Sequence, residues 1–137
     1  MSNRYIVVEI TTEFSFILKP AKHGIGVFAA HDIKKGTYLR FFGDETIATD
    51  VSVLRNKKDV PDFFKQYCVD RGEALQCPKD FGAMEVGWYL NHSKIPNAYH
   101  GNCGSYALRD IKAGEEITID YNTLEEPKEA KKEYYEN

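Results

Sequence analysis

Glycine and proline residues divide this chain of 137 residues into short segments, and this division limits the folds that it can adopt. The β-branched and aromatic residues fall into brief runs between those breakers. We expect strands at residues 5–10, 14–18, 22–30, 37–42, 105–108 and 117–121, with the second run ending before Pro20. Short helices are expected only near residues 59–62 and after Pro127. The sequence therefore predicts a mainly β fold with short helices.

Glycine-containing tripeptides mark the turns between these runs. We predict turns at Lys34-Lys35-Gly36, at Asp70-Arg71-Gly72 and at Lys112-Ala113-Gly114. The middle one separates residues 67–69 from residues 74–77, and we expect these two runs to form a hairpin.

Composition and charge exclude several classes of protein. Hydrophobic residues make up 42% of the chain and charged residues 28%, which is typical of a globular protein, and we expect a single domain over residues 1–137. The net charge of −3 argues against direct nucleic-acid binding and suits a basic polypeptide partner. We see neither a signal peptide nor a run long enough to cross a membrane. The three cysteines form no CxxC pair, so we expect a reducing compartment: the cytoplasm, or the nucleus if the protein is eukaryotic or acts in a host.

The segment Gly24-Ile25-Gly26-Val27-Phe28-Ala29 has the glycine spacing of a dinucleotide-binding loop. That function requires a helix directly after the glycines, whose N-terminus holds the pyrophosphate. Here the following residues are β-like and are broken at Lys34-Lys35-Gly36, so we exclude this interpretation. Two alternatives stay open: a turn or bulge that relieves strain, and a loop that a ligand approaches closely.

The segment Asn91-His92-Ser93-Lys94-Ile95-Pro96-Asn97 places two amides, an imidazole and a hydroxyl after an apolar run. Such residues also cap turns, and a buried structural histidine is common. The positions of His92, His100 and the cysteines at 68, 77 and 103 do not have the spacing of a zinc site, so we expect no metal. A pair of Cys103 with a histidine has no activating neighbours in the sequence.

The segment Gly114 to Tyr121 follows a predicted turn and places Ile117, Ile119 and Tyr121 on one face of a strand. Taken alone, this pattern favours a half-buried strand that ends in a core tyrosine.

Taken together and in this order, these segments resemble the SET-domain family of protein lysine methyltransferases over residues 20–123. The resemblance rests on Gly-x-Gly-Val-Phe-Ala from residue 24, Asp32-Ile33-Lys34-Lys35-Gly36, Asn-His-Ser-x-x-Pro-Asn from residue 91, and residues 110–121. It implies small curved sheets of the β-clip type with a C-terminal pseudoknot. The SET core would cover about residues 15–123, and residues 124–137 would form a C-terminal closing segment.

The resemblance also implies roles for individual residues. The cofactor would be S-adenosylmethionine, and the reaction would be methyl transfer to the ε-amine of a lysine in a protein. Tyr121 would be the catalytic residue at the methyl-transfer channel, and Asn97 would hold the loop in shape. Asn91 would bind the α-amino group of the cofactor, and main-chain atoms of His92 would contact its adenine. The remaining cofactor contacts would come from Lys22, His23, Gly24, Ile25, Gly26 and Tyr121, and the substrate channel from Phe41, Phe42, Tyr99 and Tyr121.

The chain departs from the family pattern at three places. Phe41-Phe42-Gly43 stands where many members have a tyrosine. No cysteine-rich segment follows Tyr121, so closure of the cofactor site falls to Leu124 or to Tyr134 and Tyr135. Residues 43–80, where the family builds its substrate groove, carry no family motif. The alternative function is a SET-like binding module that holds a peptide or cofactor without turnover, and a homodimer that completes the groove is compatible with either.

Overall fold

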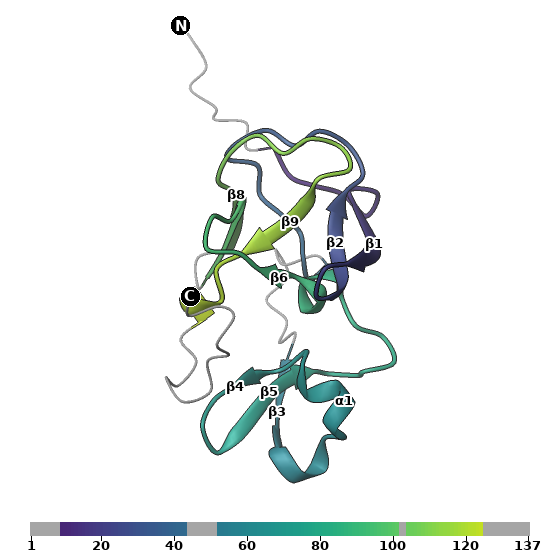
Figure 1. Cartoon of the computed structure of the whole chain (residues 1–137), viewed down its shortest axis with the longest axis vertical. Coiled ribbons are helices and arrows are strands. Elements are labelled where there is room, and N and C mark those ends of the chain that lie inside the picture. Colours follow the sequence, from purple (N-terminus) through teal and green to yellow (C-terminus); the bar gives the residue numbers. More distant parts are fainter. Residues whose placement is uncertain (1–8, 44–51, 102–103, 125–137) are drawn as a thin grey trace, which may run out of the picture.

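The computed structural model of the chain describes residues 9–43, 52–101 and 104–124. These residues form three small sheets, joined by turns and by helices of three or four residues (Figure 1). No helix in the described ranges is long and apolar enough to cross a membrane. The strands are β1 Phe16–Ala21, β2 Gly24–Ala29, β3 Ser52–Asn56, β4 Val69–Asp70, β5 Ala74–Pro78, β6 Asn91–His92, β7 Ala98–Gly101, β8 Gly104–Ala107 and β9 Glu116–Ile119. The helices are η1 Lys57–Asp59, α1 Asp62–Lys65, η2 Val86–Tyr89 and η3 Tyr121–Leu124.

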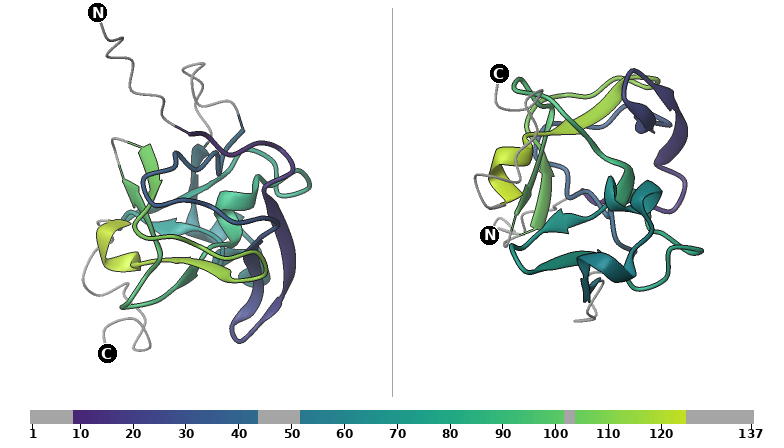
Figure 2. Two further views of the ribbon diagram at one scale, coloured as in Figure 1. Left: turned by 90° about the horizontal axis from the view of Figure 1, so that it is seen from above. Right: turned by 60° about the horizontal axis from the view of Figure 1, so that its bottom comes forward.

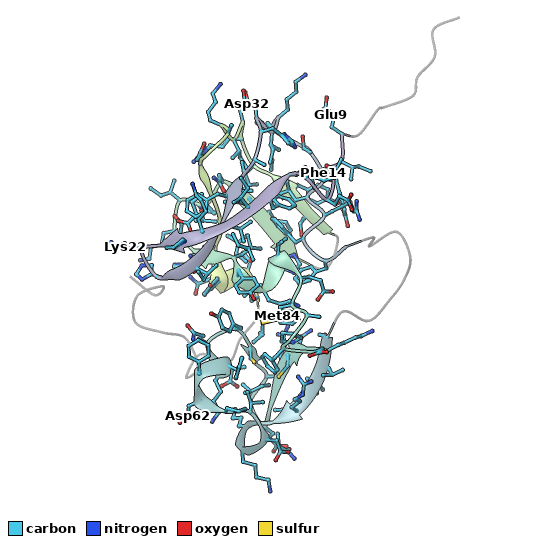
Figure 3. All side chains as sticks on the ribbon, turned by 90° about the vertical axis from the view of Figure 1, so that its right-hand side faces the viewer. Glu9, Phe14, Lys22, Asp32, Asp62 and Met84 are labelled. Atoms are coloured by element: carbon cyan, nitrogen blue, oxygen red, sulfur yellow. The ribbon has the colours of Figure 1, made fainter. Side chains whose placement is uncertain are left out.

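The four-stranded sheet, with the order β1-β2-β9-β6, unites the three motifs of the sequence. Strands β1 and β2 form an antiparallel hairpin, and Lys22 lies at its tip (Figure 3). Strand β9 pairs antiparallel with β2, and β6 pairs parallel with β9 in the register Asn91↔Thr118 and His92↔Ile119. The glycine segment, the Asn-His segment and the segment before Tyr121 therefore lie on neighbouring strands.

The remaining two sheets lie outside this framework. Strands β3, β5 and β4 form a three-stranded antiparallel sheet that lies with α1 at the lower end of the molecule in Figure 1, below the four-stranded sheet (Figures 1 and 2). It has its own small core of Val60, Leu75 and Cys77. Strands β7 and β8 form a two-stranded hairpin beside the framework.

The main core lies on one face of the four-stranded sheet. Along β9, Ile117 and Ile119 are 0% and 3% exposed, while Glu116 and Thr118 between them are partly exposed. This is the alternation expected of a strand with one buried face. The buried residues that pack with the two isoleucines include Val27, Leu39, Phe41, Leu90 and Ile111.

The structure confirms the mainly β class and many of the predicted local features. Strand β2 lies within its predicted run, the predicted β4–β5 hairpin forms with each strand extending one residue further at its C-terminal end than expected, and α1 begins directly after Pro61. The turns at Lys34 and Lys112 form with hydrogen bonds from Thr37 N to Lys34 O (3.1 Å) and from Glu115 N to Lys112 O (2.9 Å).

Three predicted boundaries were wrong, for different physical reasons. Strand β1 continues through Pro20, which is tolerated because β1 is an edge strand and needs no donor on its outer side. Residues 37–42 form isolated bridges through Tyr38 to Ile10 and Tyr106 in place of a regular strand. Strand β9 ends at Ile119, and Tyr121 begins η3. The predicted strand at residues 5–8 and the predicted helix after Pro127 lie outside the described residues.

Asn97 holds the loop after β6 against β9. Its side chain is 1% exposed. Its Nδ2 donates to the carbonyl of Glu116 (2.8 Å) and to Oε2 of Glu115 (3.1 Å), and its Oδ1 accepts from the backbone N–H of Thr118 (2.9 Å). One amide thereby satisfies two partly buried backbone groups of β9.

We predict that Asn97→Ala lowers the free energy of unfolding by about 2–6 kcal/mol, because two partly buried backbone groups each lose a partner at about 1–3 kcal/mol. Urea denaturation monitored by circular dichroism measures this change. Ile95→Ala in the same loop is the matched control, since Ile95 is 85% exposed, and its effect should stay within about 0.5 kcal/mol. Equal stability of Asn97→Ala and wild type would contradict this role.

Candidate functional site

A small cavity of about 60 Å³ brings together several residues expected to bind the cofactor. His23 and Ile25 reach it from the β1–β2 hairpin, Asn91 from β6, and Tyr121 from the start of η3. Residues Gln66, Tyr67, Trp88, Tyr89 and Leu90 complete its lining. We refer to it as the hairpin cavity.

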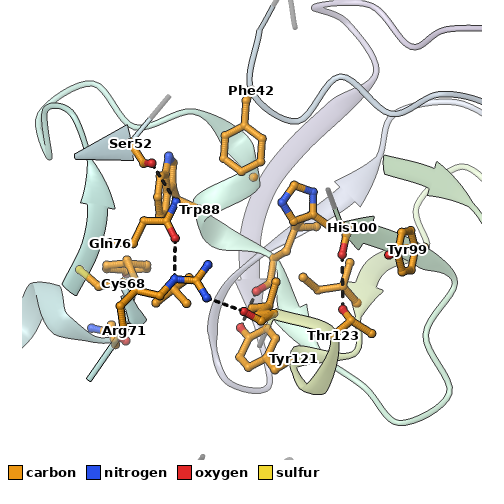
Figure 4. Close-up of a pocket in the computed structure, with 18 residues that line it drawn as sticks. Phe42, Ser52, Cys68, Arg71, Gln76, Trp88, Tyr99, His100, Tyr121 and Thr123 are labelled. Carbon is orange, nitrogen blue, oxygen red and sulfur yellow. Dashed lines mark hydrogen bonds between the residues drawn. The ribbon is translucent and has the colours of Figure 1, made fainter. Parts of the chain in front are cut away.

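A larger cavity of about 280 Å³ lies next to it and contains most of the residues expected in the substrate channel (Figure 4). Phe42, Tyr99 and Tyr121 line it, together with Trp88, His100 and residues of the three-stranded sheet. We refer to it as the aromatic cavity. Both cavities are lined by Gln66, Tyr67, Trp88, Leu90 and Tyr121, so these residues form a common wall.

Tyr121 is held in that wall at two points. Its backbone N–H donates to Nδ1 of His92 (3.0 Å), and its hydroxyl donates to the carbonyl of Leu90. Its ring packs against the His92 ring with 5.3 Å between centroids. Because β9 has ended two residues earlier, the chain turns here and carries the tyrosine out of the sheet face on which a longer strand would have placed it.

Asn91 lies on the hairpin side of the wall and is anchored from behind. Its Nδ2 donates to Oε2 of Glu116 (2.8 Å) and to the carbonyl of Ile25 (3.3 Å). The second bond connects the Asn-His segment directly to the glycine segment, although Asn91 and Ile25 are 66 residues apart in sequence.

His92 is neutral in this arrangement. Its side chain is 3% exposed, and this burial lowers the pKa of its imidazole below the ordinary value of 6.5. The carboxylate of Asp120, 3.7 Å from Nδ1, opposes the shift without reversing it. The hydrogen bond from the Tyr121 N–H requires Nδ1 as an acceptor, so in the neutral ring the proton lies on Nε2.

Phe42 and Trp88 pack against each other in the lining of the aromatic cavity. Their rings pack edge to face with 5.6 Å between centroids, and the His100 ring lies 5.3 Å from that of Phe42. A Cβ at Gly87 would overlap the Phe42 ring, so glycine is required there for the ring to pack. His100 is held by a hydrogen bond of 2.6 Å between its Nδ1 and the hydroxyl of Ser105.

Several residues with predicted site roles lie outside both cavities. Phe41 is 0% exposed and packs on Phe16 in the core, where it lines neither cavity. Lys22 and Gly24 lie in the exposed turn of the β1–β2 hairpin, and Gly26 is buried beneath Asn91 and Glu116. Leu124 lines the aromatic cavity, whereas Tyr134 and Tyr135 lie outside the described residues.

The structure adds site residues that the sequence did not single out. Trp88 and Tyr67 belong to the common wall, and His100 and Arg71 line the aromatic cavity. Arg71 donates to the carbonyl of Leu124 (2.8 Å) and to Oε1 of Gln76 (2.9 Å), which joins the three-stranded sheet to η3 (Figure 4). Only Trp88 offered a signal, because it lies just before the Asn-His segment.

Cys68 and Cys77 do not form a nucleophilic site. Their sulfur atoms lie 3.5 Å apart as free thiols. Burial, together with the Cys77 thiol, raises the pKa of Cys68 to about 12, so its thiol stays protonated at neutral pH. Cys103 lies outside the described residues, and no cluster of three or more metal-binding side chains occurs within them.

Comparison with known proteins gives a consistent result. The SET domain family matches residues 24–122 of this chain. A variant-silencing SET domain-containing protein of Plasmodium falciparum is 28% identical over 120 residues, which are 77% of this chain and 5% of that protein. A histone-lysine N-methyltransferase, H3 lysine-36 specific, of Yarrowia lipolytica is 27% identical over 118 residues, which are 77% of this chain and 15% of that protein.

Solved structures match as well. A crystal structure of a candidate histone methyltransferase of Plasmodium falciparum superposes with a TM-score of 0.48 at 22% identity, covering 79% of this chain and 93% of that chain. The chain therefore spans a small part of the two curated relatives and most of this solved chain.

We predict that stability falls as the pH drops below about 6.5, because the unfolded chain then binds a proton at His92 that the folded protein resists. This contribution is complete above the unfolded pKa and is lost as the pH falls through it toward the lower folded pKa. Urea denaturation at pH 8.0 and pH 5.5 measures the difference.

His92→Asn should reduce that pH dependence, because asparagine offers an acceptor near the place of Nδ1 but does not titrate. The wild-type chain measured at the same two pH values is the control. An undiminished dependence in His92→Asn would show that other groups cause it.

Proposed function

Because this chain belongs to the SET-domain family and is homologous to histone-lysine methyltransferases, we propose that it transfers methyl groups from S-adenosylmethionine to a lysine of a protein. The observation that carries the proposal is the common wall. Asn91, His23 and Ile25 lie on one side of Tyr121, and Phe42 and Tyr99 lie on the other. We assign the cofactor to the hairpin cavity and the lysine to the aromatic cavity.

The hydrogen-bond acceptors around the hairpin cavity suit the positively charged α-ammonium and sulfonium groups at the methionyl end of the cofactor. The side-chain oxygen of Asn91 is the acceptor on the cavity side, and the carbonyl of Ile25 and the carboxylate of Glu116 lie behind the amide on its NH2 side. At about 60 Å³ the cavity encloses only part of such a molecule, so we assign to it the amino-acid end and not the adenine. When bound, the cofactor would supply an electrophilic methyl group on a sulfonium.

Tyr121 is the residue that we propose as catalytic. Its O–H is donated to Leu90, so the hydroxyl oxygen is oriented as an acceptor at the wall between the two cavities. In that position it can align the lysine nitrogen and attract the positively polarised methyl hydrogens. Both effects act through orientation and electrostatics and need no covalent intermediate.

The aromatic cavity would favour the neutral form of the attacking amine. Free lysine has a pKa of about 10.4, so its amine must lose a proton before it can attack. Within the described residues, no carboxylate lines this cavity, and its one guanidinium, Arg71, repels an ammonium. Rings of Phe42, Trp88 and Tyr121 displace water from the channel, which further disfavours the charged form.

The substrate class follows from the same argument together with the relatives. A lysine side chain on a polypeptide can enter the aromatic cavity from the side of Tyr99, which is 38% exposed. One relative is described as specific for lysine 36 of histone H3. We therefore propose a protein substrate whose lysine lies in an accessible segment, and the net charge of −3 favours a basic segment.

Incubation of the purified chain with tritiated S-adenosylmethionine and a protein lysate tests the activity. We expect label in protein that acid hydrolysis recovers as methylated lysine. Cofactor binding without transfer to any protein would contradict the proposal and would support the alternative of a binding module.

We predict that Tyr121→Phe lowers kcat by about 10- to 100-fold and changes the Kd for the cofactor by less than about threefold. The hydroxyl acts mainly in the transition state, and a contact to a charged centre is worth about 1.5–3 kcal/mol. Tyr106→Phe is the matched control, because Tyr106 lies in β8 and lines neither cavity. Equal losses in kcat and in cofactor affinity would remove Tyr121 from the transfer channel.

A further inference from the structure

Glu116 lies on the face of β9 that points away from the main core. Ile117 and Ile119 occupy the buried face, so Glu116 and Thr118 share the opposite one. Thr118 is the register partner of Asn91 on β6, and Phe28 of β2 is the register partner of Glu116. The carboxylate of Glu116 therefore lies between the glycine segment and the Asn-His segment.

Gly26 makes room for this carboxylate. A Cβ at Gly26 would overlap Oε2 of Glu116, and it would lie 2.9 Å from Cβ of Ala21 and 3.0 Å from Nδ2 of Asn91. Gly26 has no positive φ, so its backbone conformation is open to other residues, and only space excludes them. The second glycine of the segment is thus explained by the packing of Glu116 beneath Asn91.

The carboxylate also determines which way the Asn91 amide faces. An amide can be rotated by a half turn with little change in shape, and its orientation is set by its hydrogen bonds. Both partners of the inner edge of Asn91, the Glu116 carboxylate and the Ile25 carbonyl, can only accept. The NH2 group must face them, which leaves Oδ1 for the cavity that Asn91 lines.

We propose that Glu116 is a positioning residue that presents Oδ1 of Asn91 to the α-ammonium group of the cofactor. This inference rests on the proposed function. Glu116 lines neither cavity and acts through Asn91. Within the described part of the chain no cation forms an ion pair with Glu116, so its negative charge also favours a cation bound to the far side of the amide.

A purely structural role for Glu116 makes a different prediction. If the carboxylate only held β2, β9 and β6 together, its loss would weaken every ligand of the hairpin cavity alike. If it orients the amide, its loss should matter only for ligands that carry the α-ammonium group.

The test compares two ligands by isothermal titration calorimetry on the full chain. One is S-adenosylhomocysteine, and the other is the same thioether with hydrogen in place of the α-amino group. We expect Glu116→Ala to weaken the first by about tenfold or more and the second by less than about twofold. Glu73→Ala is the matched control, because it removes the same charge from the exposed turn of the β4–β5 hairpin and should change neither value.

Two further variants make the result specific. Glu116→Gln keeps an acceptor for Asn91 without the charge, so its loss for S-adenosylhomocysteine should be smaller than that of Glu116→Ala, and it serves also if the alanine variant fails to fold. In Asn91→Ala, the added change Glu116→Ala should have no further effect on the Kd. Equal losses for both ligands, or additive losses in the double variant, would overturn the inference. Failure of the wild type to bind S-adenosylhomocysteine would overturn the proposed function itself.

Discussion

The parallel pairing of β6 with β9 is the interaction on which the rest of the site depends. Only two residues of β6 take part, yet the pairing brings residues 91 and 92 beside residues 118 and 119. A two-residue ladder has few hydrogen bonds of its own, and tertiary contacts therefore hold it. Ser93 N bonds to Ile119 O at 2.9 Å, and the Asn97 side chain continues the same edge of β9. These contacts fix where the Asn-His segment meets Tyr121.

From that pairing the division into two cavities follows. Tyr121 follows the end of β9. Its backbone N–H bonds to His92 of β6, and its hydroxyl bonds to the carbonyl of Leu90, the residue before β6. The hairpin of β1 and β2 lines only the hairpin cavity and the three-stranded sheet only the aromatic cavity, whereas η2 contributes to both. Arg71, bonded to the carbonyl of Leu124, joins that sheet to η3. The tyrosine thus lies in a wall built from segments that are distant in sequence.

Local patterns predicted much of the framework, and the limits of that prediction are physical. Alternation identified the buried face of β9, and the expected run at residues 22–30 contained β2. The same alternation misplaced Tyr121, because β9 ends at Ile119 and the chain turns into η3, where the Thr123 N–H donates to the Asp120 carbonyl at 3.0 Å. The family resemblance predicted cofactor contacts for Asn91, His23 and Ile25, which line one cavity. No local signal distinguished Phe41, which is buried in the core, from Phe42, which lines the aromatic cavity. His100 and Arg71 reach the aromatic cavity only through tertiary packing, which no short pattern encodes.

On opposite faces of β6, Asn91 acts as a hydrogen-bond donor and His92 as an acceptor, so the register of β6 against β9 is critical. Asn91 donates to a carboxylate on the outer face, whereas neutral His92 accepts from Tyr121 toward the inner one. A slip by one residue would exchange the faces, placing an imidazole over Glu116 and an amide beneath Tyr121. The carboxylate would then favour the imidazolium, which cannot accept through Nδ1. The Glu116 carboxylate needs a donor, and the Tyr121 N–H needs an acceptor. Together they specify both the order Asn-His and its register against β9.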